Sequence, residues 1–152
     1  MLKAHSGHAQ STSPKPPSPQ AYNTVYGELS GYLFNHCLSI NYERSVTQQF
    51  WVRVGYGSGG FRSVDGDSHG DGSGVMIMAE YLSGERSKLE LGLGAAAIDE
   101  LYSVRKSRLL LTPAASLGYR FQPFHGGMVF RIGLTYDFYA GLPIQISLGY
   151  AF

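Results

Sequence analysis

The sequence predicts an all-β protein of eight antiparallel strands that follow one another in up-and-down order around a barrel. Apolar and polar residues alternate with period two along most of the chain from Asn23 onward, which is the pattern of strands that present one face to apolar surroundings. The chain has 152 residues, of which 20 are glycine and 11 are tyrosine, and only 15% are charged. This length holds eight strands of about ten residues with their turns, and this composition favours strands and tight turns over helices.

Each strand is predicted from its own run of alternation. The clearest run is 34–44, in which Leu38 and Ile40 alternate with Ser39 and Asn41. The same division recurs in the segments 25–30, 50–57, 75–81, 88–95, 111–121, 128–136 and 144–152. Each of these eight segments therefore has one apolar and one polar face.

The aromatic residues indicate which face of the barrel is apolar. At the alternate strand positions that carry apolar residues, here called the apolar parity, aromatic residues gather at one end of the strands. They are Tyr42, Phe50, Tyr81, Tyr119, Phe121, Phe130, Tyr150 and Phe152. A second group at the opposite strand ends consists of Tyr32, Phe34, Tyr56 and Tyr136. Two aromatic girdles are typical of a barrel that crosses a membrane, because these rings settle at both membrane interfaces. The sequence thus predicts a transmembrane β-barrel whose apolar faces contact lipid.

The other alternate positions of the strands, here called the polar parity, carry glycine, serine and alanine together with charged residues. The charged set is Glu28, Glu43, Arg53, Glu80, Lys88, Glu90, Arg120 and Arg131. An eight-stranded barrel is just wide enough to be filled by its own side chains, so small residues leave room for charged ones that pair across the lumen. We therefore predict a plugged polar lumen. A narrow membrane channel and a soluble ligand-binding barrel carrier are the alternatives.

The connections orient this barrel, since short turns lie on the periplasmic side and longer loops outside. The segments 45–49, 83–87 and 122–127 are short, whereas 58–74 and 98–107 are longer. We interpret these two longer segments as external loops and as the contact surface for an extracellular partner.

The first 22 residues differ in composition from the rest. The run STSPKPPSPQ at 11–20 is rich in proline and serine, which predicts an extended and disordered leader. Gly7 and Ala9 have the small-x-small spacing found at the end of a signal peptide. We interpret 1–22 as a leader that could be the remnant of a signal peptide, and 23–152 as the barrel domain.

No catalytic, cofactor or metal site is predicted. Gly92, Gly94 and Ala97 have dinucleotide-fingerprint spacing, but Lys88 and Glu90 interrupt the strand before them, which a nucleotide-binding fold would keep apolar on both faces. The net charge of +1 gives no field that would attract nucleic acid, so no such partner is expected.

The segment 65–71 imitates a calcium loop, with oxygen ligands at alternate positions. Met76 stands where a bidentate glutamate is required, so we expect a solvated external loop there and leave weak divalent-cation binding open.

Five segments together resemble a known family. LSINYERSV, LELGLG, SLGYRFQP, GGMVFRIGLTYDF and ISLGYAF are similar to the small outer-membrane barrel proteins common in bacteroidetes, related in architecture to OmpX and the OmpA barrel. The resemblance covers about 23–152. It implies the cell outer membrane of a Gram-negative bacterium, contact with outer-membrane lipid and assembly by the outer-membrane insertion machinery. It also implies that Leu148, Tyr150 and Phe152 form the insertion signal, and it assigns no activity.

Overall fold

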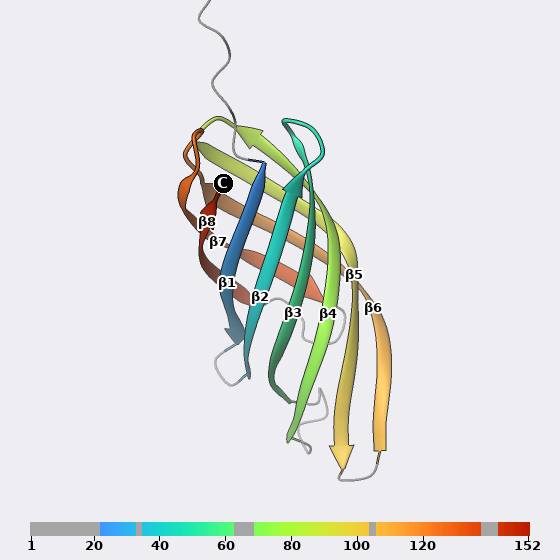
Figure 1. The fold of residues 1–152 in the computed structure, drawn as a ribbon. Coiled ribbons are helices and arrows are strands. Elements are labelled where there is room, and N and C mark those ends of the chain that lie inside the picture. Colours follow the sequence, from blue (N-terminus) through green and yellow to red (C-terminus); the bar gives the residue numbers. More distant parts are fainter. Residues whose placement is uncertain (1–21, 33–34, 63–68, 104–105, 138–142) are drawn as a thin grey trace, which may run out of the picture.

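The computed structural model describes residues 22–32, 35–62, 69–103, 106–137 and 143–152. These residues form a closed barrel in which each strand pairs antiparallel with its neighbour in sequence (Figure 1). The strands are β1 (Asn23–Tyr32), β2 (Asn35–Ser45), β3 (Phe50–Arg62), β4 (His69–Gly84), β5 (Ser87–Ser103), β6 (Lys106–Phe121), β7 (Gly127–Asp137) and β8 (Ile144–Ala151). The predicted fold class is confirmed.

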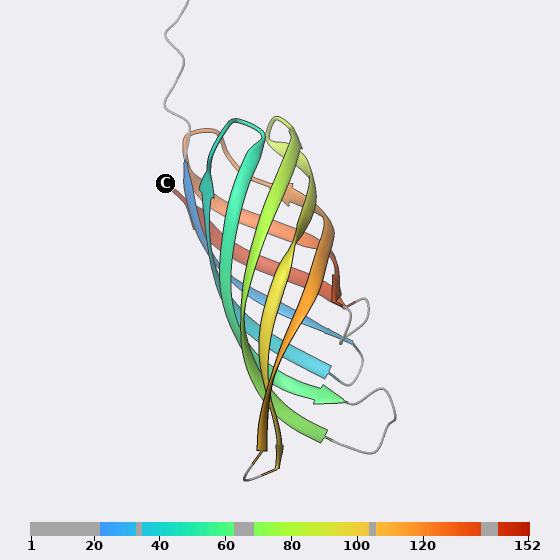
Figure 2. The same ribbon diagram turned by 90° about the vertical axis from the view of Figure 1, so that its right-hand side faces the viewer.

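The barrel closes where β1 pairs with β8, so that no edge strand remains among the described residues. The ladder between these strands runs from Thr24 opposite Ala151 to Gly31 opposite Ile144. Phe152 extends the seam beyond β8, because its amide donates to the Asn23 carbonyl at 2.8 Å and its own carbonyl accepts from the Asn23 amide at 2.9 Å. Figure 2 shows the start of β1 and the end of β8 at the same end of the barrel.

Four strands continue beyond their predicted bounds. Most of 58–74 and 98–107 is strand rather than loop, because β3 pairs with β4 as far as Arg62 opposite His69, and β5 pairs with β6 as far as Ser103 opposite Lys106. Backbone ladders need no apolar side chains, so these hairpins continue where the apolar alternation has ended. Figure 1 shows the β3–β4 and β5–β6 hairpins reaching farther down than β1 and β2. Residues 63–68 and 104–105 lie outside the described part.

The connections at the opposite end are short, as predicted. The turn between β2 and β3 is held by Thr47, whose hydroxyl accepts from the Phe50 amide at 3.0 Å, and by the Ser45 hydroxyl, which donates to the Thr47 carbonyl at 2.6 Å. Gly84 ends β4 with a φ of +112°, and an added Cβ would lie 2.3 Å from the Ser87 carbonyl oxygen. This turn therefore requires glycine.

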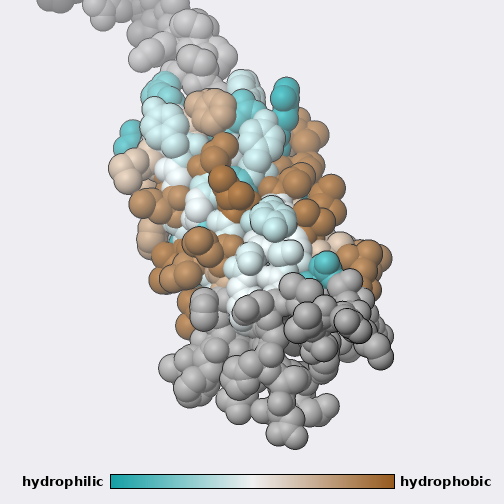
Figure 3. Space-filling view, turned by 60° about the horizontal axis from the view of Figure 1, so that its bottom comes forward, coloured by the Kyte–Doolittle hydropathy of each residue, from teal (hydrophilic) through white to brown (hydrophobic). Residues whose placement is uncertain are grey.

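Side-chain burial alternates along the strands and has the opposite sense to that of a soluble protein. On β3, the side chains of Trp51 and Arg53 are buried at 1% and 0% exposure, whereas Val54 and Tyr56 face outward. In the space-filling view, apolar side chains gather on the flanks of the barrel (Figure 3). The predicted division of each strand into two faces is confirmed, with the apolar face outward. Within the described ranges, no helix is long and apolar enough to span a membrane.

Candidate functional site

The charged residues of the polar parity all point into the barrel. Their exposed fractions do not exceed 5%, for Glu28, Glu43, Arg53, Glu80, Lys88, Glu90, Arg120 and Arg131. Every strand except β8 contributes to this set, because period two turns alternate side chains of each strand toward the lumen. Buried charges are tolerated only when they are paired and hydrogen-bonded, so their partners decide what this cluster can do.

Arg131 on β7 is the centre of the cluster, since it forms ion pairs with four carboxylates. Its Nε donates to Glu90 at 3.0 Å, and its Nη2 contacts a second oxygen of the same carboxylate and lies 3.4 Å from Glu80. Its Nη1 lies 3.2 Å from Glu43 and 3.7 Å from Glu28. These acids come from β1, β2, β4 and β5, so the ion pairs of Arg131 cross the lumen.

Arg53 on β3 anchors a second part of the network. Its Nη2 donates to Glu28 at 2.8 Å, and its Nη1 lies 3.4 Å from Glu80. Its Nε donates to the Asn41 side-chain oxygen at 3.0 Å. The other oxygen of Glu28 accepts from the Ser147 hydroxyl on β8 at 2.9 Å, so β8 joins the network through a neutral group.

Arg120 on β6 completes the set of paired arginines. Its Nη1 donates to Glu43 and lies 3.7 Å from Glu90, and its Nη2 donates to the Thr24 hydroxyl at 3.1 Å. Lys88 differs from the three arginines. It is buried in the lumen, but it makes no ion pair within 4.0 Å among the described residues, so the pairing expected of it is absent.

Two buried aromatic residues belong to the network although the sequence interpretation did not include them. The Tyr26 hydroxyl donates to Glu43 at 2.5 Å, and the Arg131 guanidinium carbon lies 4.4 Å from the centre of the Tyr26 ring. The Trp51 ring lies 5.1 Å from the Arg120 guanidinium carbon and 5.7 Å from the Lys88 ammonium nitrogen. Their position on the polar parity was the available signal, because a large aromatic residue there must lie in the lumen beside the charges.

The described part of the chain contains no group of three or more His, Cys, Asp or Glu residues arranged to hold a metal ion. Of the calcium-like segment 65–71, residues 65–68 and the side chains of 69–71 lie outside the described part of the structure.

Solved structures match this barrel over most of its length. The N-terminal β-barrel domain of Pseudomonas aeruginosa OprF aligns with a TM-score of 0.68 at 15% identity, covering 88% of this chain and 98% of that domain. Yersinia pestis Ail in a phospholipid bilayer nanodisc aligns with a TM-score of 0.57 at 16% identity, covering 88% of this chain and 100% of Ail. The fold is that of the small outer-membrane β-barrels.

A designed transmembrane β-barrel also aligns with this chain, with a TM-score of 0.53 at 13% identity and coverage of 88% of this chain and 95% of the design. No protein-family model matches the sequence, and the search of curated proteins finds no match either. The predicted resemblance to outer-membrane barrels of the OmpX and OmpA type is thus confirmed at the level of fold.

On the outside of this outer-membrane barrel fold, the residues of the expected periplasmic girdle occupy the short-turn end. All are exposed except Tyr81, which is half-buried against Phe50 with ring centres 5.3 Å apart: the exposed members are Tyr42, Phe50, Tyr119, Phe121, Phe130, Tyr150 and Phe152. Leu148, the remaining member of the expected insertion signal, also faces outward. At the other end Tyr56 and Tyr136 face outward, whereas the side chains of Tyr32 and Phe34 lie outside the described residues.

Proposed function

We propose that the protein is an integral outer-membrane β-barrel of a Gram-negative bacterium, with a lumen plugged by its charge network and a structural or surface-interaction role. The observation that carries the proposal is the inverted polarity of the barrel. Leu93 and Leu111 are 72% and 78% exposed, whereas Arg53 and Glu80 are fully buried. An apolar surface of this extent is stable when lipid covers it, and the aromatic girdles lie where the two membrane interfaces would be.

The first alternative, a soluble ligand carrier, requires the opposite arrangement. Such a barrel keeps its apolar side chains inside to hold a ligand and its charged side chains in water. Here Ile40, Ile77 and Ile146 face outward. The polarity therefore favours a membrane barrel over a carrier.

The membrane proposal predicts that the refolded protein partitions into the detergent phase and runs on a gel with different mobility before and after heating. The folded barrel should resist dodecyl sulfate until heat separates the strands, because the closed ladder leaves no edge at which unfolding can begin. The same sample after boiling is the control. Refolding to a fully soluble form without detergent would contradict the membrane assignment.

The plugged lumen is supported by ion pairs that join opposite sides of the barrel. Arg131 reaches carboxylates on four other strands, and Arg53 and Arg120 connect further strands to the same carboxylates. To admit an ion, these charged side chains would have to move apart. Each buried charge would then lose its ion-pairing partner, which costs several kcal/mol. A narrow channel is the alternative for this lumen.

We therefore expect pure protein in planar lipid bilayers to show no steady conductance steps. A general porin inserted under the same conditions supplies the positive control. Arg86→Met, which removes a positive charge from the exposed β4–β5 turn, should be equally silent because that turn lies outside the lumen. Reproducible steps from the unaltered protein would overturn the plugged lumen and support the channel.

The interaction role is assigned to the extended hairpins that include 58–74 and 98–107, because they carry the strands beyond the rest of the barrel. Ail, a neighbour in fold, is by name an attachment invasion locus protein and has been solved with a heparin analogue. An attachment role on a comparable barrel supports an extracellular partner here. The proposal includes lipid contact, assembly by the insertion machinery through Leu148, Tyr150 and Phe152, and no catalytic step.

A further inference from the structure

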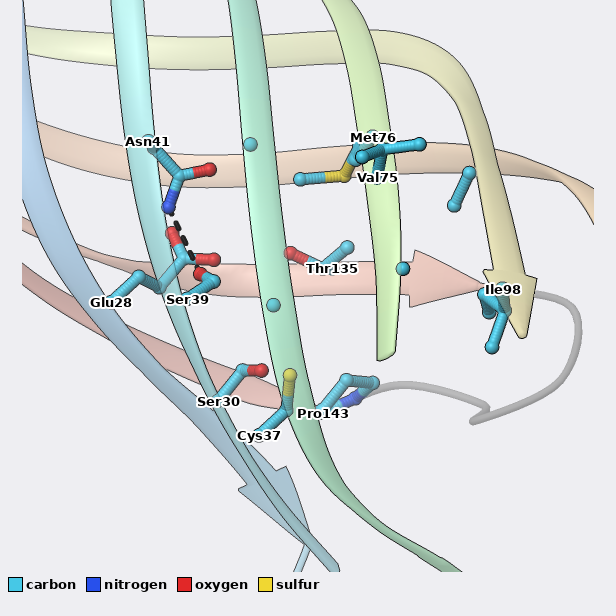
Figure 4. Close-up of a pocket in the computed structure, with 14 residues that line it drawn as sticks. Glu28, Ser30, Cys37, Ser39, Asn41, Val75, Met76, Ile98, Thr135 and Pro143 are labelled. Carbon is cyan, nitrogen blue, oxygen red and sulfur yellow. Dashed lines mark hydrogen bonds between the residues drawn. The ribbon is translucent and has the colours of Figure 1, made fainter. Parts of the chain in front are cut away.

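The external half of the lumen holds a cavity of about 130 Å³ that the charge network does not fill. It lies toward the strand ends that lead into the longer hairpins, and its inner boundary includes Glu28 and Asn41. Figure 4 shows side chains entering it from strands on different sides of the barrel. The cavity exists because small residues face inward here, notably Gly57, Gly74 and Ala96.

The walls of the cavity differ in chemistry. Hydroxyl-bearing side chains line one part, from Ser30 on β1, Ser39 on β2 and Thr135 on β7. Met76 on β4 and Ile98 on β5 line the facing part, and Figure 4 shows the Met76 side chain extending toward the hydroxyl-bearing wall. An apolar wall offers no hydrogen bonds to water, which needs two to four polar partners for stable burial.

The size of the cavity restricts what it can hold. Apolar protein cavities of roughly 150 Å³ bind benzene, so a cavity of about 130 Å³ accepts one six-membered ring. A thioether makes favourable contacts with aromatic rings, and Met76 supplies one. The hydroxyl wall offers hydrogen bonds to one polar substituent on such a ring. An anionic substituent would instead face the Glu28 carboxylate, and a cationic one would compete with Arg53 and Arg131 for it.

We propose that this cavity is a binding site for hydroxylated single-ring aromatic molecules, with the ring against Met76 and Ile98 and the hydroxyl against Ser30 and Ser39. This site lies inside the lumen, where it borders the charge network at Glu28 and Asn41. Gly74 and Ile98 line it at the base of the hairpins that carry the proposed attachment surface. A ligand of this size binds with a dissociation constant on the order of 1 mM.

Cys37 is the only cysteine of the chain, and it also lines the cavity, so it serves as a reporter. Its thiolate attacks methyl methanethiosulfonate, forming a methyl disulfide and releasing methanesulfinate. Phenol bound in the cavity should shield the thiol. At phenol concentrations about ten times the dissociation constant, we expect the rate of modification, followed by mass spectrometry, to fall about tenfold. Toluene, which has no hydroxyl, should protect less at equal concentration.

The variant Ala96→Leu fills the cavity and should abolish protection by phenol, measured as the ratio of rates with and without phenol. Ala79→Leu makes the same substitution on the outward face of β4 and should keep the protection of the unaltered protein. Heat-dependent gel mobility establishes that each variant is folded, and Ala96→Val provides a smaller filling change should Ala96→Leu not fold.

A second measurement does not depend on the thiol. Saturation transfer from protein methyl groups to phenol in nuclear magnetic resonance should appear in the unaltered protein and in Ala79→Leu, and should disappear in the filled variant. The proposal is overturned by absence of both protection and transfer in the unaltered protein, which would indicate that water alone fills the cavity. Equal protection in Ala96→Leu and Ala79→Leu would overturn it as well.

Discussion

Replacing Arg131 with methionine should lower the free energy of unfolding of the barrel by about 3–5 kcal/mol. Arg131 forms ion pairs with all four buried carboxylates, and its loss leaves Arg53 and Arg120 as the only ion-pairing cations of the described lumen. A buried charge without its partner retains the cost of leaving water and loses the attraction that offset it. The variant also loses the contact between the guanidinium and the Tyr26 ring.

Urea titration of barrels refolded into lipid vesicles measures this change, with heat-dependent gel mobility as the readout of folding. Arg86→Met is the matched control, because it removes the same charge from the exposed β4–β5 turn, and we expect its effect to stay within about 0.5 kcal/mol. The double variant Arg131→Met with Glu90→Gln should recover part of the loss, since it also removes the charge of the carboxylate that Arg131 contacts twice. Equal stability of Arg131→Met and Arg86→Met would show that the network does not stabilise the barrel.

Replacing Phe152 with alanine should reduce the amount of barrel in the outer membrane of cells several-fold while leaving refolding in detergent nearly intact. The ring of Phe152 is 59% exposed on the outward face. By the apolar area that it buries, its removal should therefore lower the free energy of unfolding by only about 1–3 kcal/mol. The resemblance to outer-membrane barrels implies that the insertion machinery reads this aromatic residue. Quantitative blotting of outer-membrane fractions, compared with refolding yield, measures both parts of the prediction.

The structure requires alanine rather than deletion in this experiment. The backbone of Phe152 pairs with Asn23 in both directions and also accepts from the Tyr22 amide at 3.2 Å, so deletion would shorten the seam that closes the barrel. Phe130→Ala is the control, because it removes a ring of the same girdle from β7, which pairs with the closing strand β8 but does not carry the expected insertion signal. Unchanged membrane levels in Phe152→Ala, or an equal fall in Phe130→Ala, would mean that these residues are not read as the insertion signal.

The number of strands, and the face of each side chain within the eight segments of clear alternation, could be predicted from the sequence. Period two turns successive residues to opposite faces whatever the partner strand, so the outward position of Ile146 and the inward position of Ser147 follow from the alternation around them. The sequence also shows that aromatic residues occur at both ends of the predicted strands. This distribution predicts that the apolar face of the barrel points outward, without knowledge of how the strands pair.

The ends of the longest strands depended on tertiary structure. The sequence analysis interpreted 58–74 as a loop because the segment is long and polar, and its Gly59 and Gly60 have low strand propensity. In the barrel these glycines pair with β4, because a ladder that is already in register adds backbone hydrogen bonds residue by residue. Local propensity does not measure that contribution.

Only the closed barrel decided which lumen residues meet. Arg131 and Glu43 are far apart in sequence and lie on strands that do not pair, so their contact depends on the curvature and register of the whole sheet. The same geometry places Lys88 over the Trp51 ring, with no carboxylate of the described residues within 4.0 Å, and leaves the cavity near Met76 unfilled. Alternation reports the face of a residue, whereas its partners across a lumen depend on how every strand between them is staggered.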